Sequence, residues 1–572
     1  MTSMQNGAGA SPLADVVRLA RGQIAVLFAL SVTSNILMLT GSVFMLQVYD
    51  RVLPSRSVET LVALTALVVV LYGFYAMIEW VRSRMAVRLG GLIQDRLAER
   101  IFPMAVRLKL AGVNGRGANP VHDLDVVRLF VSGPGAISLL DVPWVPIYLV
   151  LAFFLHPLLG SLALGGGILI AGLLVINELH SRRPAQATTV AAGERAALTG
   201  DAEANAESIV AMGMLGAVTG RWSQAADNLA RTQQRSSDRT AFYSSITKGV
   251  RYLLQSSVLA VGAFLVIQGQ ATGGVMIAAS ILSSRALAPI EQVVAQWRSF
   301  VGARQAWDRL LRVLALSGQM PRPTELPLPS ETLGVESLTT GIDRTRDPAV
   351  IGVDFKLNAG DGLGIIGPSG AGKSSVARAL VGVWPVLRGA IRLDGSELTH
   401  FDPTKLGGAI GYLPQSVELL DGTIAENIGR FNQNHDTGAI LRAAKAARVH
   451  DFIISLPDGY ETRIGSQGNS LSAGQRQRIG LARALYGDPF LIILDEPNSN
   501  LDMEGDGALS EAISDARKRG AIVVVVAHRP SAISALNKLL FMRDGRQVAF
   551  GDKDLVLHQI SVPPTMVRQQ SA

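Results

Sequence analysis

A glycine-rich stretch, Gly367–Ser375, carries the residues of this chain that are best suited to phosphate chemistry. It follows the apolar run Leu363–Ile366 and precedes a helix-like run, Val376–Val381. Glycines let successive backbone N–H groups turn toward an anion, and a helix N-terminus adds partial positive charge. Lys373 is placed to reach the β- and γ-phosphates of a nucleotide, and the Ser374 hydroxyl to bind Mg²⁺. We therefore predict a phosphate-binding loop made of Gly367, Pro368, Ser369, Gly370, Ala371, Gly372, Lys373, Ser374 and Ser375.

Two further apolar runs end in residues that complement such a loop. Leu491–Leu494 is followed by Asp495 and Glu496, and Ala521–Val526 is followed shortly by His528. Unbroken runs of this kind are typical of buried parallel strands, whose carboxyl ends collect ligands at one edge. Asp495 suits Mg²⁺, Glu496 a water that attacks phosphate, and His528 the γ-phosphate edge. Taken singly, the acidic pair is equally consistent with a helix cap and the histidine with a structural role.

A second helix start follows the stretch Leu471-Ser-Ala-Gly-Gln475. Ser472 is a natural N-cap, and the residues from Arg476 to Leu485 favour a helix. Its N-terminus is therefore a second place where an anion is stabilised. Because the loop of the same chain already covers one face of the nucleotide, we expect Ser472 to meet the γ-phosphate of a nucleotide held by another copy.

The composition indicates a chain that lies partly in lipid. Of 572 residues, 48% are hydrophobic and only 17% charged, the mean hydropathy is +0.29 and the net charge is +7. Soluble domains carry about 25% charged residues. The chain contains no cysteine, which excludes disulfides and thiolate metal sites. A basic excess fits nucleic-acid binding or the cytoplasmic loops of a membrane protein, and the arginines here flank apolar segments, which favours the second class.

Six segments are apolar and close to the roughly 20 residues that cross a bilayer. They are Ile24–Leu46, Leu61–Trp80, Leu139–Leu155, Leu158–Ile176, Tyr252–Gln268 and Gly274–Ile290. The two long intervening loops are rich in arginine, whereas the short loops opposite carry only Arg51 and Arg56. The positive-inside rule therefore predicts cytoplasmic termini and cytoplasmic long loops. We read no signal peptide in the first 23 residues.

The long loops carry the spacing of amphipathic helices, so we expect the spans to continue into the cytoplasm as long helices that transmit motion. The best example has apolar residues at three- and four-residue steps: Leu89, Ile93, Leu97, Ile101, Met104 and Leu108. An ordinary solvent-facing helical hairpin has the same spacing. Asn35, Glu79 and Gln255 lie in or near spans, and either line a substrate path or satisfy one another at helix interfaces or the headgroups.

These features divide the chain into two folded parts. Residues 1–23 form a cytoplasmic segment, residues 24–315 an all-α transmembrane domain, and residues 316–330 a linker with four prolines. Residues 331–562 alternate short apolar runs with helices, which predicts an α/β domain with a largely parallel sheet. Residues 563–572 form a tail.

In order and spacing, the residues that suit phosphate chemistry resemble the full motif set of an ABC transporter ATPase. The set comprises Gly367–Ser375, Gln415 in Tyr-Leu-Pro-Gln, Leu471–Gln475, Leu491–Glu496, Asn500-Leu-Asp502 and His528. The resemblance implies Walker A, Q-loop, signature, Walker B, D-loop and switch-histidine roles in that order. It assigns Gln415 to catalysis and Mg²⁺, and Ser472, Gly474, Gln475 and Asp502 to ATP. It further implies two ATP molecules sandwiched between two such domains, and hence a homodimer.

The membrane half is similar to the permease/ATPase of type I secretion systems, in the branch that exports RTX-type proteins and metalloproteases. The similarity rests on Phe44–Ser55 and Asp141–Tyr148. It implies a bacterial inner-membrane exporter that passes an unfolded polypeptide, selected by a C-terminal signal, to a periplasmic adaptor and an outer-membrane channel. One departure concerns adenine, on which such ATPases usually stack an upstream aromatic side chain. Residues 331–353 contain none, so we expect the phosphates to provide most of the binding.

Two other functions remain open on the sequence. An ABC exporter of lipids, peptides or small hydrophobic molecules would carry the same ATPase motifs. A soluble P-loop ATPase that acts on nucleic acid would share the loop, but the six apolar segments argue against it, and we expect no nucleic-acid partner.

Overall fold

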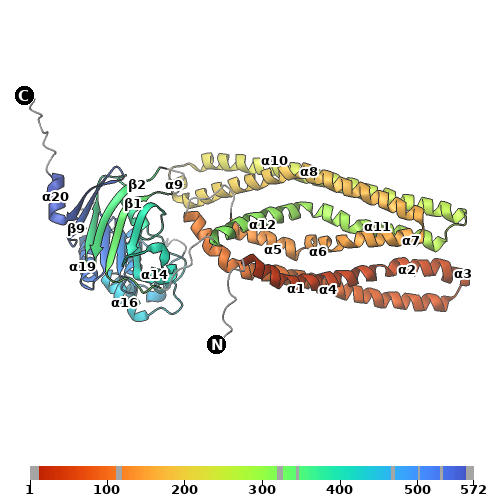
Figure 1. The fold of residues 1–572 in the computed structure, drawn as a ribbon, viewed down its shortest axis with the longest axis horizontal. Coiled ribbons are helices and arrows are strands. Elements are labelled where there is room, and N and C mark those ends of the chain that lie inside the picture. The colour runs from red at the N-terminus through yellow and green to blue at the C-terminus, as the bar shows by residue number, and fades with distance from the viewer. Residues whose placement is uncertain are drawn as a thin grey trace, which may run out of the picture. The chain divides into compact units, whose positions relative to one another are not determined.

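The computed structural model describes residues 12–110, 119–318, 326–342, 347–465, 470–499, 503–527 and 533–561. The chain divides into two compact units (Figure 1). The first contains Met1–Lys109 and Val113–Gln319, and the second contains Leu110–Gly112 and Met320–Ala572.

The first unit is helical throughout the part that the structure describes. Its helices are α1 (Pro12–Met38), α2 (Thr40–Gln47), the π-helix η1 (Val48–Val52), α3 (Leu53–Ser55), α4 (Val58–Leu110), α5 (Pro120–Ser132), α6 (Pro134–Asp141), the 3₁₀-helix η2 (Val142–Trp144), α7 (Val145–Leu155), α8 (Pro157–Ala204), α9 (Ala206–Ala211), α10 (Leu215–Ile267), α11 (Gly273–Ala295) and α12 (Trp297–Gly318).

Six stretches of these helices are long and apolar enough to cross a membrane, which confirms the predicted number of spans. They are Arg21–Ser55, Val58–Leu110, Pro134–Leu155, Pro157–Ala204, Leu215–Ile267 and Gly273–Ala295. Five of them contain a predicted segment in full, and Leu215–Ile267 contains all of Tyr252–Gln268 except its last residue. Helices α4, α8 and α10 have 53, 48 and 53 residues, more than twice the roughly 20 that a bilayer requires. The predicted spans therefore do continue as long helices.

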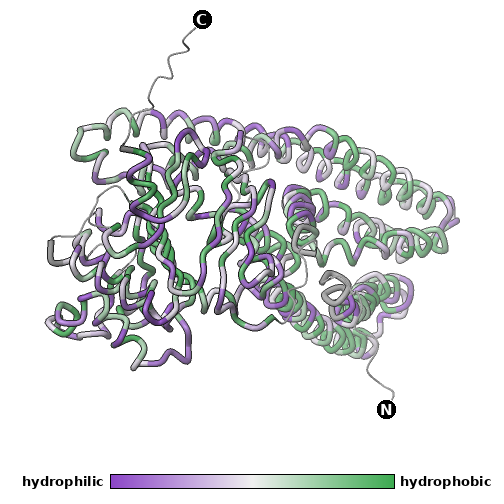
Figure 2. Tube along the Cα trace, turned by 60° about the vertical axis from the view of Figure 1, so that its left-hand side comes forward, coloured by the Kyte–Doolittle hydropathy of each residue, from purple (hydrophilic) through white to green (hydrophobic). Residues whose placement is uncertain are grey.

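The polar extension of α4 packs through the predicted apolar stripe. Leu89, Ile93, Leu97 and Ile101 are buried together with residues of α5 and α12, among them Leu124 and Leu310. In Figure 2 the hydrophobic colour is densest over the apolar spans, and hydrophilic residues become frequent in their extensions. The amphipathic spacing of α4 therefore marks a helix face that packs against other helices, and the alternative of a solvent-facing helical hairpin does not apply.

Polar side chains at the end of the second span form one buried cluster. Arg82 of α4 pairs with Asp141 at the end of α6, at 2.9 Å between Nη1 and Oδ1, and also with Glu79. Asn35 donates to Asp141 Oδ1 at 3.0 Å, and Ser34 donates to Glu79 Oε1 at 2.6 Å. Of the two alternatives for Asn35 and Glu79, the structure thus shows the helix interface.

The second unit is an α/β domain with two sheets. A six-stranded sheet has the order β10-β9-β3-β8-β7-β6, and a four-stranded sheet the order β2-β1-β4-β5. The strands are β1 (Thr332–Thr340), β2 (Val350–Asn358), β3 (Gly362–Ile366), β4 (Val386–Leu393), β5 (Ser396–Glu397), β6 (Ile410–Leu413), β7 (Leu491–Asp495), β8 (Ile522–Val526), β9 (Lys538–Arg543) and β10 (Arg546–Asp552). The helices are α13 (Lys373–Leu380), η3 (Leu398–His400), α14 (Pro403–Ala409), α15 (Ile424–Ile428), α16 (Thr437–Ala446), α17 (His450–Ser455), η4 (Gly459–Glu461), α18 (Ala473–Leu485), α19 (Met503–Lys518) and α20 (Lys553–Ser561).

The six-stranded sheet confirms the predicted largely parallel sheet. Strands β9, β3, β8, β7 and β6 run parallel, and only β10 is antiparallel to its neighbour. Alternate residues of β7 face two separate apolar clusters, with Ile492 in one and Ile493 in the other. Burial on both faces explains why the strand is an unbroken apolar run. The four-stranded antiparallel sheet adds its apolar face to the second cluster, and it is an element that the sequence did not predict.

Candidate nucleotide-binding site

The predicted phosphate loop joins the carboxyl end of β3 to the first turn of α13, and two of its three glycines are required by close backbone approaches. Gly367 has φ +150°, and a Cβ there would lie 2.2 Å from the carbonyl oxygen of Met542. Gly372 caps α13 in the left-handed conformation at φ +88°, with the carbonyl oxygen of Ala349 3.0 Å from the position of a Cβ. A side chain at either position would force the loop apart.

Lys373 lies over the loop that precedes it. Its side chain is buried, and Nζ donates to the carbonyl oxygens of Gly367 at 2.9 Å and Pro368 at 2.8 Å. Burial lowers the pKa of Lys373, while the nearby carboxylates of Glu496 and Asp495 act in the opposite direction. The ammonium group is therefore held by carbonyls that a phosphate anion would supplement or replace.

Ser374 and Asp495 meet across the site. The Ser374 hydroxyl donates to Asp495 Oδ1 at 2.9 Å, and only 1% of Asp495 is exposed. The pKa of Asp495 is raised by burial, against the hydrogen bond from Ser374 and the charges of Arg378 and Lys373. Among the described residues, its Oδ2 atom has no hydrogen-bond partner. A buried carboxylate oxygen without a partner, beside a serine hydroxyl, fits the oxygen ligands that Mg²⁺ prefers.

The neighbouring strands bring further predicted residues to the same edge of the sheet. Ile365 of β3 and Asp495 of β7 are both paired with Val526, the last residue of β8. Glu496 follows in the left-handed conformation, φ +52°, and its N–H donates to the carbonyl oxygen of Val526 at 3.1 Å. This unfavourable conformation for a glutamate turns the chain sharply directly after the strand.

Gln415 is exposed and lies two residues beyond β6, the strand parallel to β7 on its other side. His528 and Asp502 lie outside the described residues. The structure thus brings Lys373, Ser374, Asp495 and Glu496 together, with Gln415 after the adjacent strand.

Helix α18 begins as the sequence predicts, at an N-cap formed by Ser472. The Ser472 hydroxyl accepts from the backbone N–H of Gln475 at 3.3 Å, and Gln475 Oε1 accepts from the N–H of Ser472 at 2.8 Å. This reciprocal capping box stabilises the first turn. Ser472 is exposed and Gly474 is half-buried, so this helix N-terminus faces outward.

Gln477 is a residue that the sequence analysis missed. It is 3% exposed on α18, and its Nε2 donates to the carbonyl oxygens of Pro497 and Glu496, the latter at 3.4 Å. The side chain therefore connects the helix that begins at Ser472 to the turn that carries Glu496. The available signal was a glutamine on the same helical stripe as the buried apolar residue Leu481.

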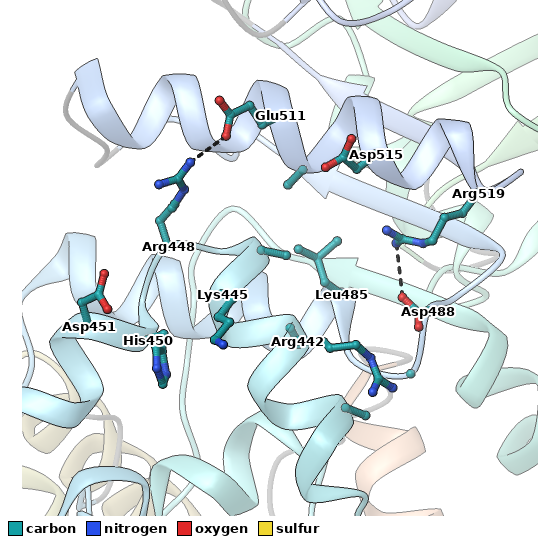
Figure 3. A pocket seen from close by; sticks show the side chains of 15 residues that line it. Arg442, Lys445, Arg448, His450, Asp451, Leu485, Asp488, Glu511, Asp515 and Arg519 are labelled. Carbon is teal, nitrogen blue, oxygen red and sulfur yellow. Dashed lines mark hydrogen bonds and ion pairs between the residues drawn. The ribbon is translucent and has the colours of Figure 1, made fainter.

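A separate pocket of about 620 Å³ lies between α16, the end of α18 and α19 (Figure 3). Its arginines and carboxylates pair across it, Arg448 with Glu511 at 2.9 Å and Arg519 with Asp488 at 3.4 Å. Asp488 and Arg519 precede β7 and β8, so the pocket lies at the amino ends of these strands, opposite the phosphate loop. Its balanced charge does not favour a triphosphate.

Fold and site together define a P-loop ATPase joined to a membrane domain with six spans. Two family models agree, the ABC transporter over residues 350–499 and the ABC transporter transmembrane region over residues 24–289. The fold is similar to that of a bacterial Atm1-family ABC exporter solved with ATP bound, with a TM-score of 0.82, 21% identity and coverage of 95% of this chain and 97% of that one.

Curated relatives narrow the class. The type I secretion system ATP-binding protein PrsD of Rhizobium meliloti (strain 1021) is 48% identical over 94% of this chain and 92% of its own length. The leukotoxin translocation ATP-binding protein LktB of Mannheimia haemolytica is 28% identical over 91% of this chain and 74% of its own. The chain belongs to the type I secretion ATP-binding proteins of the ABC transporter family. It is a multi-pass bacterial membrane protein that couples ATP hydrolysis to export, which confirms the class, fold and activity predicted from the sequence.

Proposed function

We propose that the chain acts as a homodimer in which each ATP lies between the phosphate loop of one copy and Ser472 of the other. The exposed N-cap of α18 supports this arrangement, because a helix N-terminus that faces outward can bind the phosphate of a nucleotide held by another copy. One copy holds the loop and the carboxylates at one edge of its sheet. A second copy supplies the opposite face.

Within each site the chain's own residues bind and orient the triphosphate. Backbone N–H groups of Gly370–Ser374 and the Lys373 ammonium would hold the phosphates, and Ser374, Asp495 and Gln415 would hold the metal ion. Bound Mg²⁺ neutralises charge on the β- and γ-phosphate oxygens. Glu496 accepts a proton from the attacking water, His528 contacts the γ-phosphate, and Asp502 lines the site from the other copy.

The long helices transmit closure of the ATPase dimer to the spans. Beyond the membrane, α8 and α10 are joined by α9, and this tip exposes Val210, Met212 and Leu215 at 70, 68 and 61%. Exposed apolar residues at the end of a helical hairpin are typical of a surface that contacts another protein or domain. The closed ATPase dimer binds ATP more tightly than the open dimer does. ATP binding therefore shifts the long helices toward their arrangement in the closed state, and hydrolysis allows them to return to the open one.

The cargo is an unfolded polypeptide with a C-terminal signal. The distribution of arginines supports cytoplasmic termini and a cytoplasmic ATPase, by the positive-inside rule. In this proposal the membrane is a bacterial inner membrane, and the short loops face a periplasmic adaptor that leads to an outer-membrane channel. The observation that carries this proposal is the 48% identity to a type I secretion protein over nearly the whole length. The relatives named for leukotoxin translocation support a protein cargo.

The test uses purified full-length chain in vesicles, with ATP hydrolysis as the readout. The probe is the C-terminal segment of a secreted protein encoded beside this gene, and the control is a peptide of the same composition in scrambled order. We expect the native segment to change the hydrolysis rate and the scrambled one not to. Stimulation by hydrophobic small molecules or lipids, together with no response to the segment, would replace this proposal with the small-molecule exporter.

A further inference from the structure

A groove with a strongly basic lining runs between α8 and α10 just beyond the fourth span. The two helices lie side by side (Figure 1), and the groove has a volume of about 610 Å³. Its lining contains Leu179, His180 and Arg183 of α8, and Arg235 and Arg239 of α10. The remaining lining residues are small or neutral. The nucleotide site and its chemistry, which belong to the other unit, make no use of this groove.

The arginines of the groove are not neutralised within the described part of the chain. No ion pair joins Arg183, Arg235 or Arg239 to a carboxylate there, and all three are exposed. Arg239 Nη1 donates only to a backbone oxygen, that of His180, at 2.9 Å. Glu178, next to the groove, accepts from the indole N–H of Trp297 and so faces α12. The groove therefore concentrates positive charge on one face of the helix pair.

The position of the groove along α8 corresponds to the lipid headgroups. On α8, Leu179 and Arg183 follow the last apolar residue of the fourth span, Ile176, by three and seven residues, which is about 5 and 10 Å of helix. On α10, Arg239 and Arg235 precede Tyr252, the first residue of the fifth span, by 13 and 17 residues, about 20 and 26 Å, so the groove extends from the headgroup layer into the cytoplasm. The headgroup layer is roughly 5–8 Å thick on each side of the hydrocarbon core, and an arginine side chain reaches several ångströms toward the membrane.

Apolar side chains stand between the arginines and the membrane. Leu179 is 69% exposed and Phe242, three residues beyond Arg239 toward the span, is 60% exposed. The Tyr243 ring lies 6.2 Å from that of His180, between the two helices. Apolar groups on the membrane side and cationic groups on the cytoplasmic side match the two ends of a phospholipid.

We propose that this groove binds an anionic phospholipid of the cytoplasmic leaflet, with its phosphate on Arg183, Arg235 and Arg239 and its acyl chains along Leu179 and Phe242. Basic pockets between helices on the cytoplasmic side suit such headgroups. A second copy is a poorer occupant, because the cytoplasmic extensions of this chain are themselves rich in arginine and would oppose like charges. The proposal adds a ligand to the exporter and uses the membrane orientation proposed above.

The site lies on the two helices that connect the spans to the tip at α9. A lipid bound across α8 and α10 stabilises the arrangement in which their arginines converge. If the lipid binds this arrangement more tightly than one in which the arginines are apart, it stabilises the first relative to the second. Anionic lipid would therefore affect how closure of the ATPase dimer is transmitted through α8 and α10.

The test measures lipid binding directly, with full-length chain in neutral detergent and a fluorescent phosphatidylglycerol followed by anisotropy. Unlabelled phosphatidylglycerol, phosphatidylcholine and inorganic phosphate serve as competitors. We expect phosphatidylglycerol to compete at least about tenfold better than phosphatidylcholine. The double variant Arg183→Gln/Arg235→Gln, which spares the helix contact of Arg239, should weaken binding by about 30-fold.

Two further variants separate a specific site from general charge. Arg195→Gln/Arg221→Gln removes the same charge from exposed positions of the same helices outside the groove and farther from the spans, 19 residues beyond Ile176 and 31 residues before Tyr252, and should change binding by less than about threefold. Arg183→Lys/Arg235→Lys should retain most of the binding, which shows that the glutamine variant acts through charge and not through misfolding. Unchanged binding in the glutamine variant, an equal loss in the distant pair, or displacement of the lipid by phosphate as effectively as by phosphatidylglycerol would each overturn the proposal.

Discussion

The buried cluster around Arg82 allows a quantitative test of the membrane unit. The side chains of Arg82 and Asp141 are 7% and 13% exposed, and their closest atoms are 2.9 Å apart. The substitution Arg82→Met removes the cation but leaves Asp141, which Asn35 and Ser31 also contact, as an uncompensated buried charge. Breaking a buried pair in this way costs roughly 3–5 kcal/mol. At about 2–4 °C per kcal/mol for a large domain, the apparent melting temperature should fall by roughly 6–20 °C.

The measurement is thermal melting of the full chain in detergent, followed by intrinsic fluorescence. A second substitution, Asp141→Asn, removes the uncompensated negative charge and keeps an oxygen that can accept a hydrogen bond from Asn35. The double variant Arg82→Met/Asp141→Asn should therefore recover at least half of the fall in melting temperature. Arg88→Met is the matched control, because Arg88 is an exposed arginine on the same helix and should cost less than about 0.5 kcal/mol. Equal melting of Arg82→Met and Arg88→Met would refute the assignment of a buried, stabilising ion pair.

Three further predictions concern the nucleotide site. Glu496→Gln should keep ATP binding but lower turnover by about 10²–10⁴-fold, the usual contribution of a general base, and near wild-type hydrolysis would remove Glu496 from that role. Lys373→Ala should weaken ATP binding by on the order of tenfold or more, as the loss of a charge-assisted contact, whereas the exposed Lys445→Ala should not; equal affinities would refute the phosphate contact. Because residues 331–353 offer no aromatic side chain, GTP should bind within about tenfold of ATP in equilibrium titrations, and a much larger preference for ATP would show a base contact from elsewhere.

The sequence predicted correctly those elements that depend on interactions between neighbouring residues in the chain. The phosphate loop, the six apolar spans and the N-cap at Ser472 each depend on a few consecutive residues, and the structure places the loop, the spans and the cap where the sequence put them. The parallel sheet could also be predicted from the sequence, because burial on both faces produces unbroken apolar runs such as Leu491–Leu494.

Features that depend on distant partners were not predictable in the same way. Gln477 bonds to residues about 20 positions away, and Arg82 to one 59 positions away, and neither spacing leaves a periodic trace in the sequence. The antiparallel sheet was missed because β1 is irregular, with register shifts on both sides and Ser337 at φ +44°. An interrupted register obscures the alternation by which a half-buried strand is usually found.

The central prediction is that two copies share each ATP site, and mixed dimers of differently tagged chains test this directly. In one arrangement Lys373→Ala and Ser472→Arg are on the same copy beside a wild-type partner; in the other, each copy carries one substitution. If the sites are shared, the first arrangement spoils both sites and the second leaves one intact. We therefore predict ATP hydrolysis by the second arrangement and none above background by the first. The reverse result, with activity only when both substitutions share a copy, would contradict the shared site.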